Sequence, residues 1–409
     1  MTHYEQLFSE AACVLDRWEL RDPPVGAAKY QVLDLFSGCG GMSAGFAAVG
    51  SVSGDFEVVG GCDINQYSAT SYSRNFGGKA ICGDVRALAL EPGALERFLA
   101  DLPNYQSARE TVLVGCAPCQ GFSAHGKKRW DRRDSRNSLL FAFAQVAIRL
   151  QPVAIVMENV PEMLSFRYWD DYTATRDLLE SAGYIVKAAI HNTAAFGVPQ
   201  RRFRALVVAT RGDFTMPAPV LSLSTPVTVR AAISDLPPVA AGQVLDVDPM
   251  HRSARHRPGT IEVIRQVPLD GGSRPAGVGP KCLDRTTGFS DVYGRLSWDA
   301  PAITITHYAR NPASGRYVHP EQDRGLTARE AARLQSFPDA FQFAGGFDDV
   351  FRQIGEAVPP LFATAVASSV LCSLKGIRSV GSSQEVLIEA PVTNSYSSTI
   401  SGQKMRNSA

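Results

Sequence analysis

The chain has few cysteines for its length and no long hydrophobic run. Eight cysteines in 409 residues are too sparse for a disulfide scaffold, so we expect free thiols in a reducing cytosol. The longest apolar run, Leu139 to Ile148, is interrupted by Gln145 and is far shorter than the ~18 residues that a membrane span requires. We therefore expect no transmembrane helix, and residues 1–10 lack the basic and apolar segments of a secretory signal.

An excess of charge of either sign is also missing, since 41 Lys and Arg stand against 40 Asp and Glu. This balance excludes a uniformly basic coat or tail protein, although a neutral protein can still carry one basic cleft for nucleic acid. Hydrophobic residues make up 45% of the chain, which is enough for a sizeable core and excludes disorder throughout. At roughly 150 residues per domain, the length predicts two or three structural units.

Apolar runs alternate with helical patterns over the first half of the chain. Strands are expected at residues 32–36, 57–61, 111–115, 153–157 and 205–209, and helices at residues 42–49 and 139–150. Continuous apolar strands that alternate with helices predict an α/β fold with a mostly parallel, doubly wound, Rossmann-like sheet that is covered on both faces.

The pattern changes between about residues 213 and 295, where Pro and Gly become frequent and Arg and His cluster. We interpret this segment as a second, smaller domain. The helical signal returns at Thr327, which forms a capping-box pattern with Glu330, and this helix is predicted to run to Phe337.

A last helix is predicted to open at Pro359-Pro360 and to end at Gly376. From Ser379 onward the chain is Ser-rich and aperiodic. We interpret this tail as a flexible extension without chemistry of its own.

A glycine-rich turn, residues 37–41, follows the first predicted strand. Closely spaced glycines let a ligand approach the backbone at a helix N-terminus. Ser43 stands where a dinucleotide fingerprint places its third glycine, which weakens the case for NAD or FAD, and an ordinary tight turn is the alternative. Asp63 and Asp84 lie at the next two strand ends; unless each merely caps a helix, they favour a nucleoside ligand.

The sharpest local pattern is Cys116-x-x-Cys119, directly after the strand expected at residues 111–115. It places Cys119 at the same edge of the sheet as the glycine-rich turn. A redox pair and half of a zinc site are the alternatives to a nucleophilic thiol. Because the sequence has no second Cys-x-x-Cys and no histidine in the neighbouring turns, we expect no metal site and favour a nucleophile.

Charged groups that suit a thiolate nucleophile follow at the same edge. Glu158 ends the next predicted strand, where a buried carboxylate is costly without a partner or a purpose; a structural cap is the alternative. Arg202 and Arg204 alternate along an extended segment, so they are expected to face the same side and to hold a carboxylate or a phosphate.

Taken in order, these motifs resemble those of the DNA (cytosine-5) methyltransferase family over residues 30–376. The resembling segments are 34–41 (first cofactor motif), 118–120 (nucleophile), 158–160 (acid), 200–204 (basic motif), 324–338 and 355–360 (last two motifs). The resemblance implies a class I methyltransferase fold. It also implies transfer of a methyl group from S-adenosylmethionine to C5 of a flipped-out cytosine in a specific double-stranded DNA sequence, through a covalent intermediate between Cys119 and C6.

The resemblance assigns roles to individual residues. The implied catalytic residues are Cys119, Glu158, Arg202 and Arg204. The implied cofactor-binding residues are Phe36, Gly38, Gly40, Asp63, Ile64, Asp84, Pro118 and Glu356. Glu356 stands where the family usually has Asn, and it adds a negative charge beside the cofactor.

Residues 121–138 carry six basic and two acidic side chains, hence a local charge of 6 − 2 = +4. A plain solvated loop is one interpretation. The position directly after Cys119 favours a lid that closes on DNA phosphates. The predicted DNA-binding residues are Gln120, Ser123, Lys127, Lys128, Arg129, Arg132 and Arg133.

The resemblance and the composition together predict four parts. These are an N-terminal extension (1–28), a catalytic domain (29–210 with 346–377), a target-recognition domain (211–345) and a flexible tail (378–409). We expect a cytoplasmic, nucleoid-associated monomer without membrane contact, paired in function but not physically with a restriction endonuclease. A tRNA cytosine methyltransferase on the same scaffold and an inactive DNA-binding regulator are the alternative functions.

Overall fold

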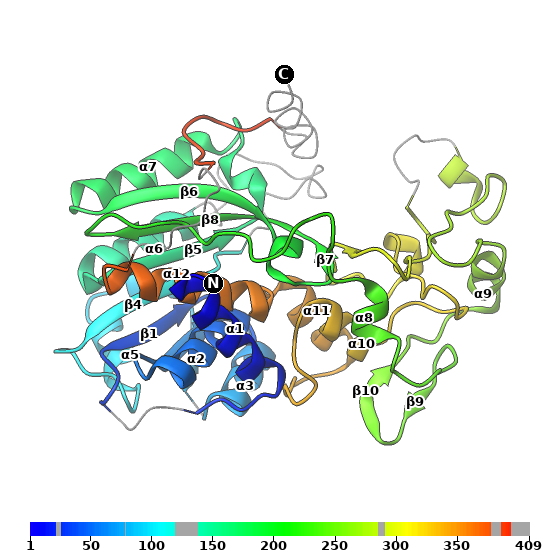
Figure 1. Ribbon diagram of the computed structural model, residues 1–409, viewed down its shortest axis with the longest axis horizontal. Coiled ribbons are helices and arrows are strands. Elements are labelled where there is room, and N and C mark those ends of the chain that lie inside the picture. Colours follow the sequence, from blue (N-terminus) through cyan, green and yellow to red (C-terminus); the bar gives the residue numbers. More distant parts are fainter. Residues whose placement is uncertain (22–25, 78, 119–137, 285–290, 378–385, 394–409) are drawn as a thin grey trace.

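Figure 1 shows the computed structural model, which describes residues 1–21, 26–77, 79–118, 138–284, 291–377 and 386–393. Its centre is a seven-stranded sheet in the order β3-β2-β1-β4-β5-β8-β6. The strands are β1 (Tyr30–Leu35), β2 (Phe56–Asp63), β3 (Ala80–Cys82), β4 (Glu110–Gly115), β5 (Ala154–Asn159), β6 (Ile185–Asn192) and β8 (Phe203–Thr210). Strands β1 to β5 pair in parallel, whereas β8 is antiparallel to β5 and β6. The predicted doubly wound, mostly parallel α/β fold is confirmed.

Two strands differ from the pattern expected from the sequence. The strand expected at residues 205–209 exists as β8, but it runs antiparallel because the short connection from β6 holds no crossover helix. Strand β6 is not predicted at all. It lies at the edge of the sheet and most of its residues are only half-buried, so it has no continuous apolar run to reveal it.

Helices cover both faces of the sheet. One face carries α1 (His3–Asp16), α2 (Gly41–Ser53), α3 (Gln66–Asn75) and α12 (Pro360–Leu374), and the other carries α4 (Val85–Leu90), α5 (Ala94–Ala100), α6 (Ser138–Leu150) and α7 (Trp169–Ser181). Successive side chains of β1 alternate between the two layers, with Val32 packed in the first and Leu33 in the second. All residues of β1 and β5 are buried, as expected for central parallel strands.

Helix α1 joins the N-terminal extension to the first of these layers. Its buried residues are Tyr4, Leu7, Phe8, Ala11 and Leu15. Their spacing places them on one face of the helix, which packs beside α2 and α12. Thr2 and Glu5 close a capping box at its start.

The segment Phe347–Leu374 is long and apolar enough to cross a membrane by length and composition alone. It consists of two helices, α11 (Phe347–Glu356) and α12, which are separated by a break at residues 357–359. Most of the segment is buried inside the fold, and α12 packs against both α1 and α2. These features are those of the core helix of a folded domain.

A smaller group of elements lies beside the sheet, on the right of Figure 1. It contains α8 (Val229–Ile233), the hairpin of β9 (Val244–Leu245) and β10 (Asp248–Arg252), α9 (Pro258–Arg265), the 3₁₀ turns η5 (Lys281–Asp284) and η6 (Pro312–Ser314), and α10 (Ala328–Leu334). It has a small core of its own, formed by Ile264, Val267, Val292, Tyr293 and Val318. A two-residue parallel pair of β7 (Gln200–Arg201) and β11 (Ala302–Ile303) connects this group to the sheet.

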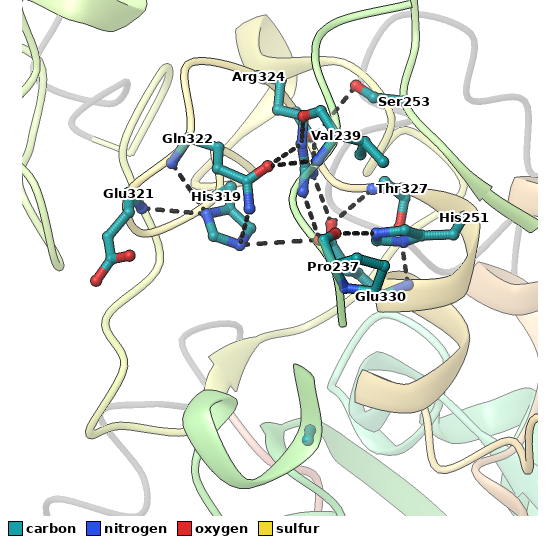
Figure 2. A network of polar contacts seen from close by, with 12 residues as sticks. Pro237, Val239, His251, Ser253, His319, Glu321, Gln322, Arg324, Thr327 and Glu330 are labelled. Carbon is teal, nitrogen blue, oxygen red and sulfur yellow. Dashed lines mark hydrogen bonds and ion pairs between the residues drawn. The ribbon is translucent and has the colours of Figure 1, made fainter. Parts of the chain in front are cut away.

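A buried polar network fixes α10 within this group (Figure 2). The capping box of Thr327 and Glu330 is present as predicted. Arg324 donates two hydrogen bonds to the Glu330 carboxylate, at 2.8 and 2.7 Å. Although burial alone raises the pKa of Glu330, Arg324 lowers it to about 2. His251 bonds Thr327 Oγ1 and the carbonyl of Pro237, so the network links β10 to α10.

Two helix and tail predictions need correction. Helix α10 ends at Leu334 rather than Phe337, because Ser336 has φ of 63°, a left-handed conformation that cannot continue a helix. The tail predicted to be flexible includes residues 386–393, which instead bond to the sheet and to the segment after β5. The last helix, predicted to open at Pro359-Pro360 and to end at Gly376, exists as α12, which runs from Pro360 to Leu374.

Candidate active site

The carboxyl ends of the five parallel strands meet at one edge of the sheet. Strands β1 and β4 are neighbours there, and the chain continues outward from them in opposite directions, to β2 on one side and β5 on the other. Such a switch point leaves a crevice in open α/β sheets, where ligands bind. The residues predicted for the site follow β1, β2, β3, β4 and β5 in turn.

Three residues of the glycine-rich turn after β1 have a left-handed backbone conformation, which favours glycine. Phe36, Gly38 and Gly40 have φ of 57°, 54° and 101°. A Cβ atom at Gly40 would lie 2.3 Å from a ring carbon of Phe76, whereas a Cβ at Gly38 would meet nothing within 4 Å. Gly40 is therefore needed for packing, and Gly38 leaves open space at the start of α2 where a ligand can approach.

Asp63, at the end of β2, holds this turn in place. One carboxylate oxygen accepts a hydrogen bond from the Gly38 amide at 2.9 Å, and the other accepts one from the Asn65 amide at 2.8 Å. Burial raises the pKa of Asp63, and these two bonds oppose the rise. Ile64, the next residue, is 68% exposed, so an apolar side chain stands open to solvent at the rim.

Asp84 follows β3 and caps α4. Helix capping was the alternative to ligand binding for this residue in the sequence analysis. Its carboxylate accepts a hydrogen bond from the Arg86 amide and lies 2.7 Å from the Arg86 guanidinium. Hydrogen bonding to Arg86 lowers the pKa of Asp84. Asp84 thus stands at the predicted edge, with its charge already partly compensated.

Two further groups near the turn, one acidic and one polar, fit a ligand that carries positive charge. Asp34 Oδ1 and Ser37 Oγ are buried without a hydrogen-bond partner in the part of the chain that the structure describes. Burial raises the pKa of Asp34 to about 7, and a hydrogen bond from Ser43 opposes the rise. These groups suit the ammonium and sulfonium charges of S-adenosylmethionine, the cofactor expected from the resemblance.

Glu356 ends α11 near Asp63. The Glu356 residue is exposed to solvent, yet partial desolvation by the surrounding protein raises the pKa of its carboxyl. Arg352 opposes that rise and Asp63 adds to it. A carboxylate at this position, where the resembling family usually has Asn, adds a further acceptor for a cationic group.

Glu158 lies at the carboxyl end of β5 and is 6% exposed. Because β8 runs antiparallel to β5, Arg204 stands beside it at the start of β8, and Arg204 Nε lies 2.8 Å from Glu158 Oε1. Burial raises the pKa of Glu158, while Arg204 and Arg202 oppose the rise. This is a dry, paired carboxyl group that can carry a proton closer to neutral pH than an exposed glutamate.

The chain between β4 and the predicted nucleophile is tied to the same strand end. Asn159 Nδ2 donates to the Ala117 carbonyl at 3.2 Å, and Asn159 Oδ1 accepts from the Val160 amide at 2.9 Å. Burial raises the pKa of Cys116 well above its ordinary value, and the charge of Glu158 adds to the rise. Cys116 is therefore a neutral thiol beside Glu158 rather than a nucleophile.

The described chain stops at Pro118, which is half-buried, and resumes at residue 138. The predicted nucleophile and DNA contacts that lie outside the described residues are Cys119, Gln120, Ser123, Lys127, Lys128, Arg129, Arg132 and Arg133. Their roles remain predictions. Among the residues that the structure does describe, no group of three or more His, Cys, Asp or Glu side chains has the arrangement of a metal site.

Arg202 and Arg204 do different things, although both were expected to act on one ligand. Arg202 is buried and donates to the carbonyls of Ile305, Gly355 and Ala357, at 2.9, 3.1 and 3.0 Å. It thereby ties β8 to the segment after β11 and to the turn that carries Glu356. We interpret Arg202 as a positioning residue.

Two buried glutamines complete this junction and were not identified from the sequence. Gln200 accepts from the Ile305 amide and donates to the Leu334 carbonyl. Gln335 donates to the carbonyls of Ile354 and Ala357. Gln200, Arg202 and Arg204 alternate along the chain. This alternation was the sequence signal that could have identified Gln200 as part of the junction.

The matching family model is that of the C-5 cytosine-specific DNA methylase, over residues 30–372. The chain is 33% identical to the Type II methylase M.HgiDII of Herpetosiphon aurantiacus, over 85% of this chain and 96% of that protein. It is also 33% identical to the Type II methyltransferase M1.HphI of Haemophilus parahaemolyticus, over 83% and 86%. A solved E. coli structure, described as a prophage-encoded DNA modification methyltransferase, matches the fold with a TM-score of 0.65 at 23% identity, over 85% of this chain and 99% of that one.

Proposed function

Because this chain belongs to the C-5 cytosine-specific DNA methylase family, we propose that its sheet-edge site methylates C5 of a flipped-out cytosine within a specific double-stranded DNA sequence. The enzyme is a DNA cytosine-5 methyltransferase that depends on S-adenosylmethionine. The proposal adds the covalent route, the extruded base and the residues that perform each step.

One observation carries the proposal most directly: the buried carboxyl of Glu158, paired with Arg204 at 2.8 Å. It stands at the carboxyl end of β5, next to the strand that leads to Cys119. Burial raises its pKa, which suits a group that must donate a proton or a hydrogen bond at neutral pH. An acid, Glu158, and a thiol, Cys119, that follow adjacent strands are suited to the addition of the thiol to a pyrimidine ring.

The chemistry requires both groups, since C5 of cytosine is too weak a nucleophile to take a methyl group directly. The Cys119 thiolate forms a bond to C6, and electron density moves toward N3 and C5. Glu158 donates at N3 and offsets the negative charge that develops there. Arg204 orients Glu158 through its charge-assisted contact.

S-adenosylmethionine supplies an electrophilic methyl group when bound. C5 forms the new carbon–carbon bond to that methyl group while the bond between the methyl carbon and the sulfonium sulfur breaks, so that a neutral thioether leaves. Removal of the C5 proton by a base then returns an electron pair to the ring, and the bond between Cys119 and C6 breaks. The aromatic ring is restored as 5-methylcytosine, and Cys119 leaves as a thiolate.

We assign cofactor binding to the turn after β1 and to the adjoining strand ends. Phe36, Gly38 and Gly40 form the turn, and we assign Asp63 to the ribose hydroxyls and Asp84 with Ile64 to the adenine. Pro118 and Glu356 flank the methionine end. The open space at Gly38 supports this assignment, as do the oxygens of Asp34 and Ser37, which have no hydrogen-bond partner among the described residues.

C6 is not accessible within a stacked duplex, so the base has to be rotated out, at a cost of a few kcal/mol. We assign the stabilisation of that state to the basic lid, residues 121–138, on the strength of its +4 charge. The smaller domain, residues 211–345, is assigned to target recognition. Its separate core, described above, supports that assignment.

The named relatives are Type II enzymes, which supports a function in a restriction–modification pair. We propose a monomer in the cytoplasm that acts on the same sequence as its endonuclease without binding it. No observation favours the tRNA substrate or the inactive regulator.

Bisulfite sequencing of DNA from cells that express the protein tests this function. One sequence motif should be protected at one cytosine in the wild type and unprotected in Cys119→Ser. Equal protection in both would contradict the nucleophile, and the absence of any protected motif in wild-type DNA would contradict the function.

A further inference from the structure

A short segment near the C-terminus lies on the catalytic sheet, beyond the part that matches the family. The family match ends at residue 372 and α12 ends at Leu374, yet residues 386–393 run beside β6 and α7, in red in Figure 1. We name residues 386–393 the C-terminal strap. It occupies the side of the sheet where β6 is the last strand.

The first half of the strap pairs with β6. Leu387 and Ala189 form an antiparallel bridge, and the Ile388 amide donates to the Ala188 carbonyl at 2.8 Å. Leu387 packs against the core of the α2 layer and Ile388 against the core of the α6 layer. Two successive side chains that pack on opposite faces are the pattern of a strand, and they cover an edge that would otherwise expose unpaired backbone groups.

The second half of the strap binds the turn that follows the acid strand. This turn is the 3₁₀ helix η3 (Pro161–Leu164). The Val392 amide donates to the Leu164 carbonyl at 2.9 Å, and Val392 forms a parallel bridge with Ser165. Val392 is 7% exposed and belongs to the same buried cluster as Met163 and Leu164.

Only a few residues separate the contact between Val392 and Leu164 from Glu158 in the candidate active site. Leu164 lies six residues after Glu158, and η3 begins directly after Val160. Met157, the neighbour of Glu158 on β5, belongs to the same buried cluster as Val392. Asn159 in turn holds the Ala117 carbonyl. The strap therefore supports the turn through which both the acid and the nucleophile segment are positioned.

We propose that the C-terminal strap positions Glu158 for methyl transfer by anchoring η3, and that Val392 is its principal positioning residue. This proposal rests on the proposed function of Glu158 as the group that donates at N3. Without the strap, the Leu164 carbonyl and the outer edge of β6 lose their partners, and water gains access to the turn behind Glu158.

Access of water has a consequence that a purely structural contact would not produce. Burial raises the pKa of Glu158, so hydration lowers that pKa toward its ordinary value. Glu158 must be protonated to donate, so activity falls as pH rises through its pKa. Loss of the strap contact should therefore move the alkaline limb of the kcat profile to lower pH.

The test uses the full chain with Val392→Asp, its conservative counterpart Val392→Ile, and Val386→Asp as a control. Val386 belongs to the same segment but is 56% exposed. We expect Val392→Asp to lower kcat by about tenfold and to move the alkaline limb down by about one pH unit, with the cofactor Kd unchanged. Val392→Ile and Val386→Asp should behave like the wild type.

Hydrogen exchange on the wild-type protein tests the docking independently of any variant that fails to fold. The amides of Ile388 and Val392 should exchange slowly, because each donates to a carbonyl of the catalytic core. Free exchange at both positions would overturn the proposal, as would a kcat profile for folded Val392→Asp that falls in height without moving. An inactive wild type would instead contradict the proposed function and leave the exchange result to decide whether the strap docks.

Discussion

Glu158 and Arg204 meet because one strand of the sheet reverses direction. Arg204 is the second residue of β8, which runs antiparallel to β5, so the start of one strand lies beside the end of the other. A parallel strand in that place would have put Arg204 at the opposite edge. The pair thus depends on the antiparallel direction of β8, which the sequence pattern did not predict.

Glu158→Gln should slow methyl transfer by about 10²- to 10⁴-fold, the range for loss of a positioned general acid. The amide cannot deliver a proton to N3, although it nearly preserves size and shape. Single-turnover methylation measures the effect, and the cofactor Kd should stay within twofold. Glu180→Gln, on the exposed part of α7, is the control; a comparable loss there would point to a general disturbance of the fold.

Arg204→Met should change the pH dependence in the direction opposite to Val392→Asp. The positive charge of Arg204 opposes the burial that raises the pKa of Glu158, so its removal should raise that pKa further. The alkaline limb of the kcat profile then moves to higher pH, while kcat itself falls because Glu158 loses its orienting partner. An unshifted limb would show that another group governs the alkaline side.

At the scale of elements, the best-predicted parts are those with a strong local signal. Strands β1, β2, β4 and β5 each carry an apolar run because they are buried on both faces, and the capping box at Thr327 is formed within four consecutive residues. Strand β6 and the C-terminal strap escaped prediction, because an edge position needs little apolar sequence. Their pairing depends on long-range contacts that no local pattern encodes.

The candidate site was predictable to a similar degree. Asp63 and Glu158 end strands, so their edge position follows from periodicity alone. The separate functions of Arg202 and Arg204 do not, since alternation suggests a shared face but cannot say which carbonyls or carboxylates lie opposite. The junction of Gln200 and Gln335 likewise appears only when α10 and the end of α11 come together.

Arg202→Met tests that junction. The change removes a buried donor from the carbonyls of Ile305, Gly355 and Ala357, and only Ala357 keeps a second donor in the described part of the chain, Gln335. The free energy of unfolding should therefore fall by about 3 kcal/mol or more. Urea denaturation measures the loss. Arg201→Met is the matched control, because Arg201 is the exposed neighbour; equal effects at both positions would refute the assigned positioning function.

At the scale of the whole molecule, we propose separate functions for three parts: a catalytic sheet, a smaller domain that reads the DNA sequence and a basic lid that binds phosphate. The nearly neutral net charge means that affinity for DNA has to come from local clusters. The lid is one such cluster that the sequence identifies. Its contribution should therefore be separable from sequence recognition.

Replacement of Lys127 and Arg132 by Ala should weaken DNA binding for all sequences alike and flatten its dependence on salt, because fewer counterions are released. The methylated motif should stay the same. Binding isotherms on cognate and unrelated duplexes across a salt series measure both quantities. Arg97→Ala, on exposed α5, is the control, and a changed motif with unchanged affinity would assign these residues to base recognition instead.

The covalent step is the central claim, and a duplex that carries 5-fluorocytosine at the methylated position tests it most directly. Methyl transfer can proceed on this base, but fluorine cannot leave C5 as a proton does, so the bond between Cys119 and C6 should persist. Denaturing gels should show a protein–DNA adduct that requires S-adenosylmethionine and is absent in Cys119→Ser. A wild-type enzyme that methylates the normal duplex yet forms no adduct with the fluorinated one would contradict the mechanism.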